Sequence, residues 1–226
     1  YIRVPSSWAI VLPKGLSAKE AMSLGTAGLT AGLSVHALES YRDYIGLSDT
    51  KSIVTGATGG VGSVAVMLLS KLGSEVTAVT GKNDQLDFLS SIGASHVLSR
   101  EELVETTRKP IGKSIWDVGI DVVSGNILSL LLTSLKPGGA VACSGLVGGH
   151  SFESSILPFI LRGNALLGID SVEISLEAKT HIWEHFSSDW KINLDHSTKE
   201  IVLEDLPDEI ETILGGGQVG RVLVQL

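Results

Sequence analysis

The chain has 226 residues, 43% of them hydrophobic, and a formal net charge of -8 at pH 7. That length suits one large domain, or one domain with part of another, and the acidic balance argues against a nucleic-acid-binding surface. No apolar run reaches the roughly 18 residues needed to cross a bilayer, and we expect no signal peptide. The single cysteine excludes an internal disulfide and a cysteine-built zinc site. We therefore expect a cytoplasmic protein without nucleic-acid or membrane partners.

The first dozen residues have a strand-like pattern, with apolar side chains at Val4, Trp8, Ile10 and Leu12. The sequence does not begin with methionine, and the pattern starts as if within a strand. We therefore expect the chain to be a fragment whose upstream sequence is absent.

Ser17 and Glu20 form the pattern of a capping box and predict the start of a helix. The helical pattern is interrupted by a glycine-rich break at residues 25–28. Strands and helices then alternate. The expected strands are 52–55, 75–80, 96–98, 117–122, 139–145 and a sixth from residue 165, and the expected helices are 61–72, 84–92, 126–135 and 156–161. Apolar strands joined by helices predict an α/β fold with a parallel sheet covered on both faces.

The alternation stops after Asp170. A helix is expected over 176–190, followed by a strand, a helix, a glycine turn and a closing strand. We expect this tail to belong to the same second domain as the first dozen residues.

The turn between the first strand and its helix carries the sequence TGATGGVG, from Thr55 to Gly62. Gly56, Gly59 and Gly62 are spaced so that the first permits a sharp turn, the second lets backbone amides approach a pyrophosphate, and the third lets the helix pack on the strand. The N-terminus of the following helix offers free N–H groups to phosphates. The pattern favours a dinucleotide site, although a tight turn without a ligand would need glycines too.

The end of the second strand reads Thr80, Gly81, Lys82. A site for NAD usually has an acidic residue there, which binds the ribose 2′-hydroxyl. Here a hydroxyl and an ammonium group suit the 2′-phosphate of NADP instead, and Asp84 is read as a helix-start residue. The alternative for Lys82 is a solvated loop lysine.

Other candidate sites are weaker. The short-chain dehydrogenases need a Tyr-x-x-x-Lys pair, and no tyrosine of this chain has a lysine four residues later. His181 and His185 are one helical turn apart, but no third ligand is near in sequence, so we predict no metal site. Asp121 either orders a cofactor hydroxyl or caps a turn, and we favour the cap. Cys143 is expected to pack in the core.

Five stretches in this order, AMSLGTAGLTAGLSVHALE, VTGATGGVGSVAVMLLSKLG, VTGK, LGIDSV and GRVLVQL, resemble the medium-chain dehydrogenase/reductase superfamily. The likeness is strongest to its zinc-free acryloyl-CoA reductase and quinone oxidoreductase branch. It implies a Rossmann doubly wound parallel sheet with remnants of a GroES-like β-rich catalytic domain. The implied division is 1–22 as the end of the catalytic domain, 23–168 as the Rossmann domain and 169–226 as the return, with about 100 residues absent before Tyr1.

The resemblance also implies a cofactor site. Its residues are Thr58, Gly59, Gly60 and Val61 at the pyrophosphate; Thr80, Gly81 and Lys82 at the 2′-phosphate; Arg100 as a further contact; Thr26, Asp170 and Ser171 near the nicotinamide; and Ser144, Gly145 and Leu146 ending the fifth strand. The last turn, GGGQVGR, is richer in glycine than is usual in the family, so no side-chain contact is expected from residues 215–217. No catalytic residue can be named.

The implied activity is NADPH-dependent reduction of a C=C bond conjugated to a carbonyl, in an acryloyl-CoA-like thioester or in a quinone or enone. A homodimer is implied as well, formed through an exposed edge strand near residues 165–169. The alternative is a module that binds NADP(H) as a sensor and does not catalyse a reaction. An upstream GroES-like domain would favour the enzyme.

Overall fold

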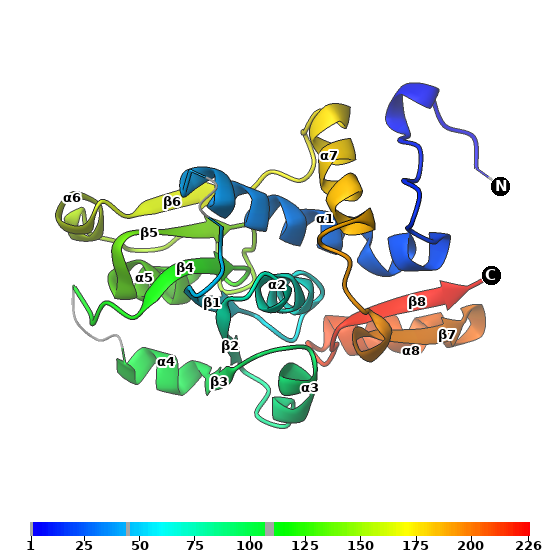
Figure 1. The fold of residues 1–226 in the computed structure, drawn as a ribbon. Coiled ribbons are helices and arrows are strands. Elements are labelled where there is room, and N and C mark those ends of the chain that lie inside the picture. Colours follow the sequence, from blue (N-terminus) through cyan, green and yellow to red (C-terminus); the bar gives the residue numbers. More distant parts are fainter. Residues whose placement is uncertain (1, 44–45, 107–110) are drawn as a thin grey trace.

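The computed structural model describes residues 2–43, 46–106 and 111–226. Its centre is a six-stranded parallel sheet of order β3-β2-β1-β4-β5-β6, shown in Figure 1. The strands are β1 (Lys51–Thr55), β2 (Glu75–Thr80), β3 (His96–Ser99), β4 (Trp116–Asp121), β5 (Leu135–Cys143) and β6 (Ala165–Gly168). The strand order reverses beside β1, where β2 lies on one side and β4 on the other. This confirms the predicted α/β fold and makes the carboxyl end of β1 the place where such sheets bind ligands.

Helices cover both faces of the sheet (Figure 1). They are α1 (Ala18–Tyr41), α2 (Gly60–Lys71), α3 (Leu86–Ser91), α4 (Arg100–Thr106), α5 (Gly125–Ser134), α6 (Leu157–Arg162), α7 (Leu176–Ser187) and α8 (Leu206–Leu214). Successive residues of β1 serve the two faces, because Val54 packs with α1 and α2 whereas Ile53 packs with α4 and α5. The continuous apolar sequence of the strands follows from this two-sided burial.

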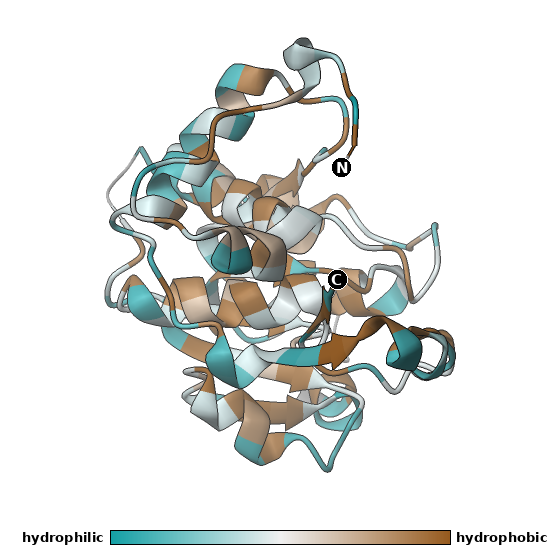
Figure 2. Ribbon diagram, turned by 90° about the vertical axis from the view of Figure 1, so that its right-hand side faces the viewer, coloured by the Kyte–Doolittle hydropathy of each residue, from teal (hydrophilic) through white to brown (hydrophobic). Residues whose placement is uncertain are grey.

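Hydropathy follows the same layers (Figure 2). Hydrophobic residues are concentrated along the central strands and the helix packed on them, and hydrophilic residues lie mainly on the outer helices and loops. None of the helices in the described ranges is long and apolar enough to span a membrane.

The first long helix begins and bends as the sequence predicts. The Ser17 hydroxyl accepts a hydrogen bond from the Glu20 amide at 3.1 Å, and the Glu20 carboxylate accepts one from the Ser17 amide at 2.7 Å. The Ser17 hydroxyl also donates to the Glu20 carboxylate at 2.7 Å, and this bond together with the one from the Ser17 amide holds the pKa of Glu20 below its ordinary value. The helix is interrupted at Gly25, whose φ of 52° and ψ of -154° are not helical. Glycine tolerates this backbone conformation because it has no Cβ.

The tail contains the predicted strand, helix and closing strand. Strand β7 (Thr198–Val202) pairs in parallel with β8 (Arg221–Gln225), and α8 connects them. The described part of the chain also contains three short 3₁₀ helices: η1 (Ser6–Trp8), η2 (Asp195–Ser197) and η3 (Leu203–Asp205).

The structure differs from the sequence-based expectations in three places. The strand-like start is wrong: residues 6–8 form η1, no strand is found among residues 2–17, and Val11 is 90% exposed, so this apolar segment has no ladder partner. Helix α4 was not expected. Strand β5 begins at Leu135 rather than at 139, because Leu135 already pairs with Trp116 across a bulge. Tyr1, the first residue of the expected 1–22 segment, lies outside the described residues.

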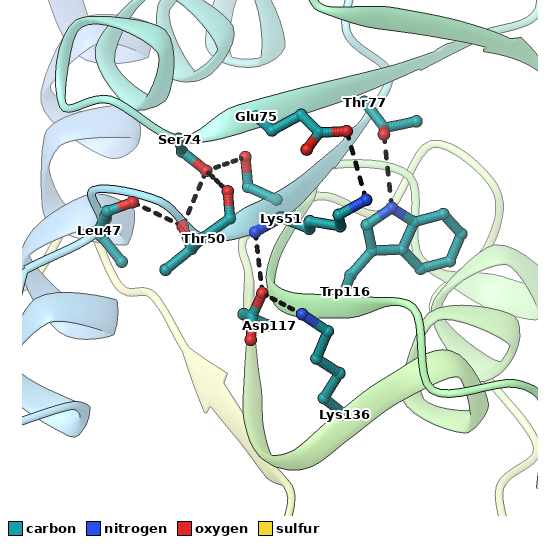
Figure 3. A network of polar contacts seen from close by, with 10 residues as sticks. Leu47, Thr50, Lys51, Ser74, Glu75, Thr77, Trp116, Asp117 and Lys136 are labelled. Carbon is teal, nitrogen blue, oxygen red and sulfur yellow. Dashed lines mark hydrogen bonds and ion pairs between the residues drawn. The ribbon is translucent and has the colours of Figure 1, made fainter.

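The amino-terminal ends of the strands carry a network of polar side chains bonded to one another (Figure 3). The Asp117 carboxylate accepts hydrogen bonds from the Lys51 amide and from Nζ of Lys136, both at 2.8 Å. The hydroxyls of Thr50 and Ser74 are 2.8 Å apart and buried. These groups bond to one another, so we interpret the polar residues at this end of the sheet as structural.

Candidate functional site

A cleft of about 540 Å³ lies at the carboxyl ends of the central strands. Ten of the residues expected at a cofactor line it together: Thr58, Gly59, Gly60, Val61, Thr80, Gly81, Lys82, Arg100, Ser144 and Gly145. They come from the turns after β1, β2, β3 and β5, which are far apart in sequence and meet at one edge of the sheet. Six lining residues were not in the expected set: Gly56, Gly62, Val122, Val123, Val147 and Gly216.

The turn after β1 depends on its glycines. Gly56 has a φ of 58°, and its carbonyl accepts a hydrogen bond from the Gly59 amide at 2.9 Å. A Cβ on Gly62 would stand 2.3 Å from the Gly56 carbonyl oxygen, so only glycine allows α2 to pack this close to the turn. The helix starts after Gly59 without a side-chain cap, which leaves its first amides directed at the cleft edge for a ligand.

The cations of the cleft gather at the end of β2. The Thr80 hydroxyl accepts a hydrogen bond from the Lys82 amide at 2.9 Å. The Arg100 guanidinium crosses Gly81 so closely that a Cβ there would stand 2.8 Å from Nη2. Lys82 reaches over the cleft, where its Nζ donates to the Gln218 carbonyl, and partial burial lowers the pKa of Lys82 from its ordinary value. Among the described lining residues none is acidic.

A fully buried carboxylate fixes the turn after β4, next to Val122 and Val123 of the cleft. Asp121 accepts hydrogen bonds from the Thr55 hydroxyl at 2.6 Å and from the Ser124 amide at 2.8 Å. These bonds close the turn after β4, which confirms the cap that the sequence favoured. The Cys143 thiol lies 3.7 Å from the same carboxylate, and burial together with the charge of Asp121 raises the pKa of Cys143 to about 11.

The wall of the cleft at β5 is as tight as the turn after β1. A Cβ on Gly145 would stand 1.9 Å from the Val122 carbonyl oxygen, so glycine is required for the two loops to meet. The neighbouring Ser144 hydroxyl oxygen is buried and has no hydrogen-bond partner. An uncapped helix start, a glycine cradle, two cations and an unpartnered hydroxyl are what a dinucleotide with a phosphorylated ribose would need.

Four expected residues do not line this cleft. Thr26 follows the bend of α1, where its carbonyl accepts a bond from the Thr30 hydroxyl. Leu146 is 69% exposed, and Val147 takes the place at the cleft instead. The Asp170 carboxylate accepts bonds from the Val172 and Glu173 amides, which hold its pKa below the ordinary value. Ser171 follows in the same loop.

Arg221, at the start of β8, was not among the expected residues. Its Nε donates to the Ser23 carbonyl at 2.9 Å, and its guanidinium lies over both Gly60 and Gly25, where a Cβ would stand 2.8 and 2.9 Å away. Burial lowers the pKa of Arg221. The arginine therefore joins β8, the bend of α1 and the start of α2. The only sequence signal was its place in the closing stretch GRVLVQL.

Metal ligands are not concentrated in the described part of the chain. In residues 2–43, 46–106 and 111–226, no group of three or more His, Cys, Asp or Glu side chains is arranged to bind a metal ion.

The comparisons with known proteins agree with this geometry. The family model described as zinc-binding dehydrogenase matches residues 60–187. The chain is 46% identical to YhfP of Bacillus subtilis, named as a quinone oxidoreductase, over all of this chain and 68% of that protein. It is 41% identical to the acrylyl-CoA reductase AcuI of Ruegeria pomeroyi, over 99% of this chain and 67% of that protein.

Two solved structures match almost the whole chain. The yhdH oxidoreductase of Salmonella enterica in complex with NADP superposes with a TM-score of 0.93 at 40% identity, over 99% of this chain and 68% of that one. The yhfP protein of Bacillus subtilis with NAD bound superposes with a TM-score of 0.92 at 44% identity, over the same shares. The chain therefore belongs to the zinc-binding dehydrogenase family, within the medium-chain dehydrogenase/reductase superfamily of oxidoreductases.

Proposed function

We propose that this protein uses NADPH to reduce a C=C bond conjugated to a carbonyl group, in an acryloyl-CoA-like thioester or in a quinone or enone. Two relatives that match nearly the whole chain carry the names acrylyl-CoA reductase and quinone oxidoreductase. A double bond conjugated to a carbonyl is already electrophilic at its β-carbon, so the proposed reaction requires no Lewis acid.

The observation that carries the cofactor assignment is the cationic end of the cleft. Lys82 and Arg100 flank Gly81 at the end of β2, and Thr80 adds a hydroxyl. A 2′-phosphate would be favoured there by charge-assisted hydrogen bonds, whereas the ribose hydroxyl of NAD would lack its usual acidic partner.

The chain's own residues bind and orient the cofactor. The amides at the start of α2 stabilise the pyrophosphate charge, and the glycines let the backbone approach it. The valines after β4 and Val147 provide an apolar surface between the two polar ends of the cleft. The Ser144 hydroxyl is free to donate a hydrogen bond to the bound molecule. Bound NADPH would supply the hydride, and the protein contributes position and electrostatics.

The test is a steady-state assay of NADPH oxidation with acryloyl-CoA, a benzoquinone and a saturated acyl-CoA as acceptors. We expect turnover with one or both conjugated acceptors and none with the saturated thioester. NADPH binding without oxidation in the presence of any acceptor would contradict the proposed reaction and support a sensor of NADP(H).

We further propose the division into residues 1–22 and 169–226 as parts of a catalytic domain and 23–168 as the Rossmann domain. The bend of α1 at Gly25 and the separate β7–β8 sheet support these boundaries. We propose a cytoplasmic homodimer formed at β6, which is the last strand of the sheet. The helix that precedes it, α6, exposes the apolar side chains of Ile160 and Leu161. Sedimentation equilibrium measures the dimer; a monomer at micromolar concentration would contradict it.

A further inference from the structure

Helix α7 places two imidazoles against each other outside the cofactor cleft. His181 and His185 are one turn apart, and their Nε2 atoms are 3.2 Å from each other. Residues four apart share a face of an α-helix, which explains why the rings meet. None of the residues that line the cofactor cleft belongs to α7.

A carboxylate determines which nitrogen of His185 faces its neighbour. Nδ1 of His185 is 2.9 Å from the Asp189 carboxylate. An ionised carboxylate accepts hydrogen bonds and cannot donate them. Burial tends to raise the pKa of Asp189, but hydrogen bonds from His185 and Ser188 outweigh it and hold the pKa below its ordinary value. With Nδ1 of His185 held by Asp189, Nε2 is the ring nitrogen that faces His181.

The two Nε2 atoms are within hydrogen-bonding distance of each other. A carboxylate on the far nitrogen of a histidine is the usual support of a histidine that ligates a metal, since it fixes the tautomer and the ring orientation. A separation of 3.2 Å also suits two nitrogens bound to one ion, because Zn–N bonds of about 2.0–2.1 Å at a tetrahedral angle put the nitrogens roughly 3.3 Å apart.

The ring of His185 is held in place by a buried tryptophan. It stacks on Trp190 with ring centroids 4.5 Å apart and an interplanar angle of 23°, and Trp190 is only 1% exposed. The side chain of His185 keeps 28% of its surface exposed, and His181 is an exposed residue, so an ion can reach the pair from solvent.

Helix α1 contributes the remaining groups that face the pair. The ring of His36 meets His181 edge-on, with the ring centroids 5.1 Å apart. Burial raises the pKa of Glu39, with smaller, mutually opposing effects from His185 and Asp189. Burial first, and then the two histidines of α7, lower the pKa of His36, which keeps a second positive charge away from the pair.

We propose that His181 and His185 chelate one divalent transition-metal ion of the imidazole-preferring class, such as Zn²⁺, Ni²⁺ or Cu²⁺, with Asp189 as the positioning residue. The two Nε2 atoms bind the metal, and water fills the other coordination positions. The site is a two-histidine chelate on the surface of α7 and does not take part in the proposed reduction.

The experiment is a competition titration of the folded chain with Zn²⁺ against a coloured chelator, at pH 7.5 and in a buffer that does not bind metals. We expect one ion per chain. His181→Gln and His185→Gln each lower the affinity at least tenfold, and Asp189→Asn lowers it roughly 10–100-fold. His150→Gln removes an exposed imidazole from a different loop and leaves the affinity within about twofold, so it is the matched control.

Acid provides a second readout. A histidine binds a metal through an unprotonated nitrogen, so the Zn²⁺ affinity of the pair falls as the solution is acidified. Unchanged Zn²⁺ affinity in the His181→Gln/His185→Gln double variant would overturn the proposal. Equal losses in His150→Gln and His181→Gln would also overturn it, because they would indicate binding at scattered histidines.

Discussion

The two ends of the parallel sheet use similar polar residues to opposite effect. At the amino-terminal ends of the strands, Asp117, Lys51 and Lys136 bond to one another (Figure 3). At the carboxyl ends, Lys82 and Arg100 stand beside an uncapped helix start, and the buried Ser144 hydroxyl has no partner. Residue type alone does not separate a structural network from a binding site. At the carboxyl ends the uncapped amides of α2 and the Ser144 hydroxyl lack partners, whereas the groups of the amino-terminal network are bonded to one another.

The strongest test of this difference is Gly62→Ala. The added Cβ would stand 2.3 Å from the Gly56 carbonyl oxygen and 2.8 Å from Cα of Ala57, so α2 must move away from the turn. We expect NADPH affinity to fall by about a hundredfold, or roughly 2.7 kcal/mol. Calorimetric titration measures it, with circular dichroism as the check of folding. Gly168→Ala is the control, since a Cβ there meets nothing within 4 Å. Unchanged NADPH binding in Gly62→Ala would contradict the account.

The reactivity of Cys143 tests a polar network at the carboxyl end whose central carboxylate, Asp121, already has hydrogen-bond partners. Burial and the Asp121 carboxylate raise the thiol pKa to about 11, from an ordinary value of 9.0. A raised thiol pKa means less reactive thiolate at a given pH, so at pH 8 we expect alkylation of the folded chain to be roughly a hundredfold slower than in denaturant. Mass spectrometry over time measures both rates. Similar rates would show that the thiol is neither buried nor coupled to Asp121.

Lys82→Met and Arg100→Met test whether the cations at the carboxyl end distinguish NADPH from NADH. Each removes a cation from the proposed 2′-phosphate site, and we expect each to weaken NADPH binding about tenfold, or about 1.4 kcal/mol. NADH affinity should change by less than about twofold, because NADH lacks the phosphate. Lys136→Met removes a cation from the opposite end of the sheet and serves as the control. Equal losses for both cofactors would mean that the two residues do not recognise the phosphate.

Asp117→Ala addresses the structural end and has the smallest expected effect on NADPH affinity. It leaves the Lys51 amide and the Lys136 ammonium without their shared acceptor. Because this carboxylate is partly exposed, we expect a loss of only about 1–2 kcal/mol of unfolding free energy, measured by urea denaturation. NADPH affinity should stay within about twofold. A large loss of NADPH affinity would show that the two ends of the sheet are coupled.

Much of the fold was predictable because its signals are local. Alternating apolar strands and helices predicted the parallel sheet, and Ser17 with Glu20 predicted the start of α1. Helix α4 had a similar signal that was overlooked: the Ser99 hydroxyl accepts a bond from the Glu102 amide, and the Glu102 carboxylate accepts one from the Ser99 amide. The exposed first residues show the limit, since apolar alternation does not form a strand without a neighbour to pair with.

The site was predictable where one turn carries several residues. The glycines after β1 and the Thr80–Lys82 turn follow a sequence pattern, and the structure brings them together. Gly216, Val123 and Arg221 reach the region through contacts between distant segments, which no local spacing encodes. The sequence predicts Leu146 at the cleft, but Val147 lines it. A shift of one residue in a loop changes which side chain reaches the cleft, and the sequence pattern does not fix that register.

The most direct test of the central claim is the ratio of NADPH to NADH affinity for the unmodified chain, measured by calorimetric titration. The ratio is informative because yhfP of Bacillus subtilis was crystallised with NAD and yhdH of Salmonella enterica with NADP. The account predicts that NADPH binds at least about tenfold more tightly, or about 1.4 kcal/mol, and that added salt reduces the preference. Equal affinities, or tighter binding of NADH, would contradict the assignment of Lys82 and Arg100 to a 2′-phosphate.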